Sequence, residues 1–225
     1  MRGLNQEYFT MKEDADSSLK CNSGKEVTHK LGIMGGTFDP IHNGHLAVAE
    51  VIRSQFALDK VIFVPSLCPP HKGLSDIASV EHRYAMVNLA IADNPFFESS
   101  RIEIDRPCPT YAGDTIEAFR KMYGKNRELY FITGLDALLN VVSRDRSRTY
   151  PGICQFIAAA RPGFDKKEIA ESIPLDFKPS ITIIEEPALA ISSTEIRARI
   201  KAHLTIENMV PAVVREYIAN KGLYL

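Results

Sequence analysis

Two histidines, His42 and His45, stand shortly after a pair of glycines, and imidazole N–H groups can donate hydrogen bonds to a phosphate. The glycines, Gly35 and Gly36, follow a short apolar run, and an amphipathic segment begins at Leu46. This order predicts a strand, a glycine turn and the start of a helix. Glycine lets backbone N–H groups approach a phosphate closely, and the helix dipole favours an anion there. The segment therefore predicts a nucleotide site with both imidazoles in one pocket.

A second segment whose residues suit phosphate lies near the end of the sequence, at residues 191–197 (ISSTEIR). Ser192 or Ser193 is a good helix N-cap, and Arg197 lies one turn further along. A guanidinium beside a helix N-terminus can bind phosphate oxygens. The chain lacks both the GxGxxG fingerprint of dinucleotide-binding proteins and the GxxxxGK[ST] phosphate loop. The histidine turn would have to replace them.

The composition is that of an ordinary soluble globular protein, with 225 residues, 45% of them apolar and 24% charged. This length predicts one sizeable domain. The net charge of -1 excludes a global positive field that would attract nucleic acid or an anionic membrane. No apolar run approaches the roughly 18 residues of a membrane-spanning helix, and the first residues lack the apolar core of a secretory signal. We therefore expect a cytoplasmic protein with no nucleic-acid or membrane partner, and the sequence leaves a homo-oligomer open.

The four cysteines are widely spaced and form no CxxC pair; they are Cys21, Cys68, Cys108 and Cys154. A disulfide framework or a zinc knuckle would be expected to show a tighter pattern. The spacing therefore predicts reduced thiols.

Residues 1–30 are polar and mixed in charge, and we interpret them as an extension outside the fold. From residue 31 apolar runs alternate with amphipathic segments, which predicts a single Rossmann-like α/β domain over residues 31–225, with a doubly wound parallel sheet and flanking helices. Strands are predicted at 31–34, 60–65, 97–105, 128–133, 154–163 and 181–186. Helices are predicted from residue 46, at 80–92 behind a Ser79 cap, at 115–123 between Asp114 and Gly124, after the serines of ISSTEIR, and at 211–220 before Gly222.

The motifs carry a family resemblance. GGTFDPIHNGHL (35–46) and ISSTEIR resemble the two motifs of the nucleotidyltransferase superfamily, GxFxPxHxGH and ISSTxIR. Within it, the added segments PPHK, TYxxDT, FITGxD and ARPG make the chain similar to the bacterial nicotinate mononucleotide adenylyltransferases, from about residue 31 onward. The resemblance implies transfer of AMP from ATP to nicotinate mononucleotide, which gives nicotinate adenine dinucleotide and pyrophosphate in NAD biosynthesis.

The chemistry of that reaction fits the residues. The 5′-phosphate of a mononucleotide is ionised at neutral pH, so its attack on the α-phosphorus of ATP needs no general base. His42 and His45 would donate to the α-phosphate, where charge builds up, and Arg197 would clamp the β- and γ-phosphates. Mg²⁺ would arrive with ATP, because the sequence shows no dedicated carboxylate cluster.

Further roles are implied by the resemblance alone. Asp136 would accept hydrogen bonds from ribose hydroxyls, and Arg161 would lie near the nucleotide. The implied ATP site comprises Gly35, Gly36, Thr37, Phe38, His42, His45, Gly134, Asp136, Arg161, Ser192, Ser193 and Arg197. The implied mononucleotide site comprises Lys72 at the phosphate, the backbone N–H groups of Ala112 and of the stretch after Leu139 at the nicotinate carboxylate, and Arg144.

Arg144 marks a departure from the family. Relatives commonly place an aromatic residue there to stack on the nicotinate, but this chain has no tryptophan. A guanidinium can also stack on a ring, and its charge attracts the nicotinate carboxylate. The alternative is a solvated arginine in a rebuilt loop.

Other assignments also have simpler structural alternatives. The histidine pair could form a metal site with His71, although no carboxylate or thiolate completes the ligand set at metal-binding spacing. Lys72 could be a solvated loop lysine, and Asp114 or Asp136 could be a plain helix cap. The joint occurrence of the motifs favours the functional interpretation.

The sequence leaves two other functions open. Another adenylyl- or cytidylyltransferase of the superfamily, acting on phosphopantetheine or glycerol phosphate, would share the histidine motif and ISSTEIR but is not expected to carry PPHK and TYxxDT together. A non-catalytic nucleotide-binding or regulatory module would not need His42, His45 and Arg197. A class I aminoacyl-tRNA synthetase is set aside, because the near-neutral chain has no KMSKS-like loop and no room for tRNA recognition.

Overall fold

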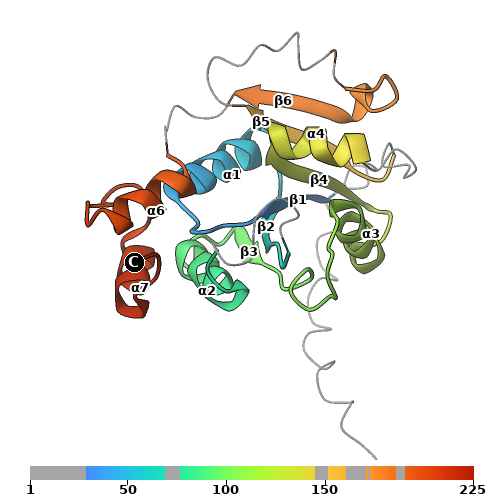
Figure 1. The fold of residues 1–225 in the computed structure, drawn as a ribbon. Coiled ribbons are helices and arrows are strands. Elements are labelled where there is room, and N and C mark those ends of the chain that lie inside the picture. Colours follow the sequence, from blue (N-terminus) through green and yellow to red (C-terminus); the bar gives the residue numbers. More distant parts are fainter. Residues whose placement is uncertain (1–28, 69–76, 145–151, 161–170, 172, 186–190) are drawn as a thin grey trace, which may run out of the picture.

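Six parallel strands form one sheet at the centre of the protein, in the order β3-β2-β1-β4-β5-β6 (Figure 1). The computed structural model describes residues 29–68, 77–144, 152–160, 171, 173–185 and 191–225. The strands are β1 (His29–Gly36), β2 (Lys60–Pro65), β3 (Phe97–Ser99), β4 (Arg127–Gly134), β5 (Gln155–Ala160) and β6 (Ile181–Glu185). The doubly wound α/β fold predicted from the sequence is confirmed.

Helices cover both faces of the sheet. They are α1 (Asn43–Gln55), α2 (Val80–Ile91), α3 (Ala112–Tyr123), α4 (Leu135–Arg144), α6 (Ser193–Lys201) and α7 (Ala212–Lys221), with a 3₁₀ turn at Lys178–Ser180. In the described part of the chain, no helix has the length and apolar character needed to cross a membrane.

Alternation along the strands divides the core into two layers. On β2, Val61 and Phe63 pack into the cluster formed with α1, α2, α6 and α7, whereas Ile62 and Val64 pack into the cluster formed with α3 and α4. All four side chains are buried. Burying a side chain of this size contributes about 1.5–3 kcal/mol, so packing on the sheet stabilises these helices.

The order of the strands creates a switch point between β1 and β4. The chain runs from β1 through β2 to β3 at one edge and then returns to β4 on the other side of β1. Ligands of open parallel sheets bind at such a point, outside the carboxyl ends of the strands. Here those ends are Gly36 of β1 and Gly134 of β4.

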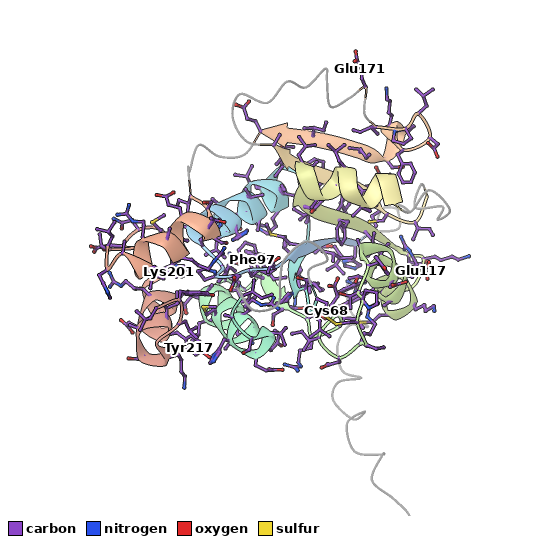
Figure 2. The ribbon with its side chains drawn as sticks, viewed as in Figure 1. Cys68, Phe97, Glu117, Glu171, Lys201 and Tyr217 are labelled. Carbon is purple, nitrogen blue, oxygen red and sulfur yellow. A yellow bond between two sulfur atoms is a disulfide. The ribbon has the colours of Figure 1, made fainter. Side chains whose placement is uncertain are left out.

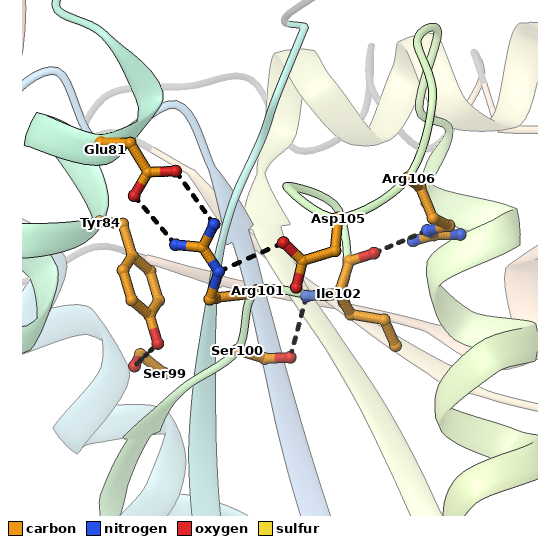
Figure 3. A network of polar contacts seen from close by, with 8 residues as sticks. All are labelled: Glu81, Tyr84, Ser99, Ser100, Arg101, Ile102, Asp105 and Arg106. Carbon is orange, nitrogen blue, oxygen red and sulfur yellow. Dashed lines mark hydrogen bonds and ion pairs between the residues drawn. The ribbon is translucent and has the colours of Figure 1, made fainter. Parts of the chain in front are cut away.

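The residues after β3 turn instead of continuing the strand predicted at 97–105. The Asp105 N–H donates to the Arg101 carbonyl at 3.0 Å, which closes a turn. Both terminal nitrogens of Arg101 donate to the carboxylate of Glu81 on α2 at 3.0 Å, and its Nε donates to the Asp105 carboxylate at 3.2 Å (Figure 3). The turn is thereby attached to α2 at the surface.

Several helix boundaries follow the predicted signals. Ser79 caps α2 by accepting from the His82 N–H, Gly124 ends α3 with φ 72°, and Gly222 ends α7 in the left-handed region. The start of α3 is a correction: Tyr111 is its N-cap and has no capping side-chain bond, whereas Asp114 lies inside the first turn. The start of α1 is also earlier than residue 46.

The prediction of reduced cysteines is wrong for one pair. Cys68, after β2, forms a disulfide with Cys108, before α3 (Figure 2). The two residues are 40 positions apart, and the fold brings their Cα atoms to 6.1 Å, which sequence spacing cannot reveal. Cys154 is a free thiol, and burial raises its pKa to about 12. Cys21 lies outside the described residues.

Candidate active site

A cavity of about 340 Å³ lies at the switch point. The ends of β1 and β4 form its floor, and the starts of α1 and α6 form its walls. Its lining residues are Met34, Gly35, Gly36, His42, Gly44, His45, Val48, Ile132, Thr133, Gly134, Ala137, Ala159, Ile191, Ser192, Ser193 and Thr194. The two sequence motifs thus meet in one cavity, although they are separated by most of the chain.

His42 and His45 cap the start of α1 reciprocally. The His42 Nδ1 accepts from the His45 backbone N–H at 3.3 Å, and the His45 Nδ1 accepts from the His42 backbone N–H at 3.2 Å. An Nδ1 that accepts a hydrogen bond carries no proton, so the ring proton is on Nε2 in both residues. The rings stack with centroids 3.6 Å apart. In each histidine the Nε2–H thus lies on the side of the ring opposite the helix backbone.

Small residues allow this close packing. A Cβ on Gly44 would lie 3.0 Å from the His42 Nδ1, and a Cβ on Gly36 would lie 2.8 Å from the Phe38 ring. Phe38 is buried and meets the His45 ring edge-on, with centroids 5.1 Å apart. Phe38 thus supports His45 from behind and does not itself line the cavity.

The start of α6 contributes a second set of donors. Ser192 is the N-cap, and its hydroxyl accepts from the Glu195 N–H at 3.2 Å. The Ser193 hydroxyl donates to the Pro40 carbonyl at 3.0 Å, which ties α6 to the turn between β1 and α1. Both serines and Thr194 line the cavity. The N-terminal backbone N–H groups of α6 can therefore serve an anion there.

Arg197 lies beside the cavity rather than in its lining. Its Nη1 donates to the Asp39 backbone carbonyl at 2.8 Å and lies 3.5 Å from the Asp39 Oδ2. The arginine side chain is 19% exposed. The residue predicted as a phosphate clamp is therefore held against the histidine turn, with both of these contacts made through one nitrogen.

A second arginine near Asp39 was not predicted from the sequence. Arg83 of α2 is 1% exposed; its Nη1 donates to the Thr37 carbonyl at 2.7 Å and its Nε to the Ala78 carbonyl at 3.0 Å. Burial lowers the pKa of Arg83, and the nearby Asp39 carboxylate raises it. A signal was present, because Arg83 lies at helical spacing from the buried Met86 on the apolar face of α2.

The segment that carries TYxxDT forms its own buried network. The Thr115 hydroxyl donates to the Glu103 Oε1 at 2.6 Å, and the Thr110 hydroxyl donates to the Oε2 at 3.2 Å. The Arg106 Nη2 donates to the Thr115 hydroxyl oxygen at 2.7 Å. Burial raises the pKa of Glu103, and the two threonines oppose that shift. This network fixes the chain on both sides of Ala112, the first residue of α3.

The remaining predicted residues divide into three groups. Gly134 lies in the cavity lining, and Thr37 holds the turn through its carbonyl. Asp136 and Arg144 belong to α4, with backbones placed but side chains outside the described atoms. Lys72, Arg161 and His71 lie outside the described residues, and among those that are described no cluster of three or more His, Cys, Asp or Glu could hold a metal ion.

Comparison with known proteins gives the family of the chain. The cytidylyltransferase-like family model covers residues 33–199. A protein of Moorella thermoacetica named as a nicotinate-nucleotide adenylyltransferase is 51% identical over 198 residues, which are 87% of this chain and 91% of that protein. A protein of the same name from a Thermoanaerobacter species is 48% identical over 87% of this chain and 94% of its own.

Solved structures share the fold. The nicotinic acid mononucleotide adenylyltransferase of Plasmodium falciparum, solved in complex with NaAD, aligns with a TM-score of 0.68 over 87% of this chain and 97% of that chain, at 21% identity. At that identity the likeness supports the fold, while the closer relatives support the family. The chain therefore belongs to the nicotinate-nucleotide adenylyltransferases, nucleotidyltransferases of the cytidylyltransferase-like family.

Proposed function

We propose that the chain transfers AMP from ATP to nicotinate mononucleotide and releases pyrophosphate, a step of NAD biosynthesis, with His42 and His45 as catalytic residues. The observation that supports the residue assignment is the reciprocal capping of these histidines, because it orients both rings at the switch-point cavity with Nδ1 toward the helix backbone. The family of the chain supports the reaction.

The reaction forms one bond and breaks one. A 5′-phosphate oxygen of the mononucleotide bonds to the α-phosphorus of ATP, and the bond from that phosphorus to the bridging oxygen of the β-phosphate breaks. The mononucleotide phosphate is already ionised, so no protein base has to remove a proton. The two Nε2–H groups would donate to the α-phosphate oxygens, whose charge grows in the transition state. Donors fixed in advance stabilise that charge without reorganisation.

Arg197 would bind the departing pyrophosphate with the α6 N-terminus. Its Nη1 is engaged by Asp39, and the guanidinium has further N–H donors that a β- or γ-phosphate could accept. Ser192 and Ser193 line the cavity at the same helix start. Mg²⁺ would be carried by the ATP phosphates and by water, since the described residues offer no acidic cluster for a dedicated site.

The mononucleotide side is assigned through the family resemblance. We place Lys72 at the mononucleotide phosphate and the Ala112 N–H at the nicotinate carboxylate, with Arg144 as the candidate for stacking on the ring. The adenosine would contact Gly134, Asp136 and, further along the chain, Arg161. We place the reaction in the cytoplasm, where ATP is available.

Pyrophosphate release is the direct test. ATP is supplied with nicotinate mononucleotide, nicotinamide mononucleotide or phosphopantetheine in parallel reactions, each at several concentrations. The proposal predicts the highest kcat/KM with nicotinate mononucleotide and formation of nicotinate adenine dinucleotide in equal amount to pyrophosphate. A preference for phosphopantetheine, or turnover with none of the three, would contradict it.

A further inference from the structure

Asp39, in the turn between β1 and α1, carries a carboxylate that is fully shielded from solvent. Its Oδ1 accepts two hydrogen bonds, one from the Ala78 N–H at 3.0 Å and one from the Tyr224 hydroxyl at 2.8 Å. Its Oδ2 is buried and accepts no hydrogen bond, and the Arg197 Nη1 lies 3.5 Å away. The orientation of this carboxylate therefore decides how strongly Asp39 holds Arg197.

Tyr224 comes from the other end of the fold. It follows α7 and lies 185 positions from Asp39 in the sequence. Burial and the adjacent carboxylate raise the pKa of Tyr224 above its ordinary value, so its hydroxyl keeps its proton and donates to Asp39 at any working pH. The donor is thus permanent, and it occupies the oxygen that does not face Arg197.

Arg83, the buried arginine of α2, does not decide how the Asp39 carboxylate is oriented. Arg83 also lies near Asp39, but its Nη1 and Nε are committed to the carbonyls of Thr37 and Ala78. A buried carboxylate that loses a hydrogen-bond donor is destabilised. It is stabilised again most effectively by moving closer to a guanidinium that still has N–H groups to donate. In the described structure the nearer such group is Arg197, whose contact with the carboxylate is long and made through a single nitrogen.

We propose that Tyr224 is a positioning residue for Arg197. By donating to the Asp39 Oδ1, its hydroxyl keeps the carboxylate from closing on Arg197 as a two-point ion pair. Arg197 then stays anchored through the Asp39 backbone carbonyl while its other donors remain free to take pyrophosphate oxygens. This inference rests on the proposed role of Arg197 as the ligand of the leaving group.

The first test removes only the hydroxyl. Tyr224→Phe should lower kcat/KM for ATP roughly tenfold, the scale of a lost hydrogen bond to a charged group, and should leave KM for nicotinate mononucleotide within about twofold. The inhibition constant of inorganic pyrophosphate should rise by a similar factor. Unchanged ATP kinetics and unchanged pyrophosphate inhibition would overturn the proposal.

Tyr217 supplies the matched control. It lies on α7 (Figure 2), and its hydroxyl is 2.9 Å from the His82 Nδ1, away from Asp39. Tyr217→Phe removes an equivalent tyrosine hydroxyl from the same part of the fold and should leave the kinetics of both substrates unchanged. An equal loss in both variants would show that Tyr224 only helps α7 to pack, and the proposal would fail.

A double-mutant cycle separates positioning from folding. In an Arg197→Met background, Tyr224→Phe should cause no further loss of kcat/KM for ATP, because the residue through which it acts is absent. The same loss of effect is expected in an Asp39→Asn background. A tenfold loss that persists in both backgrounds would overturn the proposal even if Tyr224→Phe were less stable. Normal turnover of Arg197→Met would overturn the proposed role of Arg197 in binding pyrophosphate as well as this inference. Impaired turnover of Arg197→Met together with normal turnover of Tyr224→Phe would overturn this inference alone.

Discussion

The turn between β1 and α1, at residues 37–42, and the loop at residues 100–111 both follow the carboxyl ends of strands in the same sheet, but different kinds of contact hold them. The turn is held from distant parts of the chain: Arg83 binds its Thr37 carbonyl, Arg197 binds its Asp39 carbonyl, and Tyr224 binds the Asp39 carboxylate. Asn43, at its end, donates through its side chain to the Asn208 carbonyl at 2.8 Å.

The loop is held mainly by its own neighbours. Arg101 pairs with Asp105, and Glu103 accepts from Thr110 and Thr115. Its long-range contacts include the Ser100 N–H bond to the Phe63 carbonyl at 2.9 Å, the surface pair between Arg101 and Glu81, and the disulfide to Cys68.

This difference matches the two tasks that we propose. Donors that stabilise a transition state must be fixed before the reaction, and buried contacts from several elements can fix them. A loop that recognises the second substrate can be shaped locally and can vary among relatives without disturbing the reacting centre.

The largest effect should come from removing the buried arginine beneath the turn. Arg83→Met removes the side-chain donors to the Thr37 and Ala78 carbonyls and one of the two guanidinium charges near Asp39, so the free energy of unfolding should fall by about 3–5 kcal/mol. Urea denaturation measures this change. Arg101→Met is the matched control on the loop, where the exposed pair is screened by solvent, and it should leave the free energy of unfolding nearly unchanged. If both variants lost the same free energy of unfolding, the buried arginine would stabilise the fold no more than the surface arginine does, which would contradict this comparison.

The next largest effect concerns the histidines. His42→Ala and His45→Ala should each lower kcat by about 10²–10³ and change KM for either substrate much less, because their bonds strengthen as charge develops on the α-phosphate. Steady-state kinetics give both constants. His82→Ala, which removes a histidine from α2 outside the cavity, should keep near-normal turnover. Near-normal turnover of either His42→Ala or His45→Ala would instead remove that residue from the mechanism.

The disulfide tests the loop side of the comparison. Replacing Cys68 and Cys108 by serine together should lower the free energy of unfolding by about 2–4 kcal/mol, because the unfolded chain regains the freedom of a long loop. KM for the mononucleotide should rise while KM for ATP stays within error. A thiol reductant added to the unmodified protein should reproduce both changes. Parallel rises in the two KM values would show that the disulfide supports the whole site.

Much of the fold could be predicted because local patterns determined it. The apolar run at 60–65 is β2 as predicted, and Gly124 and Gly222 end their helices where the glycine signal placed them. The strand predicted at 97–105 is only β3 and a turn, since Ile102 and Ile104 alternate like strand residues but pack from a turn.

The site was predictable to the extent that it lies in short motifs. The histidine turn and the start of α6 are contiguous segments, and the fold brings both to one cavity. The bond between Asp39 and Tyr224 joins residues 185 positions apart and depends on how α7 packs, so no local pattern reports it. Arg83 was predictable in part. The sequence shows a lone arginine on the apolar face of a helix, but it does not show which groups that arginine contacts.

The smallest expected effect concerns Arg144, the last residue of α4. If its guanidinium stacks on the nicotinate ring and attracts the carboxylate, Arg144→Met should raise KM for nicotinate mononucleotide several-fold and narrow the preference over the amide form, with KM for ATP unchanged. Arg146→Met is the matched control, since it removes a neighbouring charge from the same stretch of sequence. Parallel kinetics with the two mononucleotides decide the matter. If the ratio of kcat/KM for the acid and amide mononucleotides is unchanged in Arg144→Met, the carboxylate is recognised by backbone N–H groups such as that of Ala112. If Arg144→Met and Arg146→Met change this ratio equally, the effect comes from the net positive charge of the segment and not from stacking.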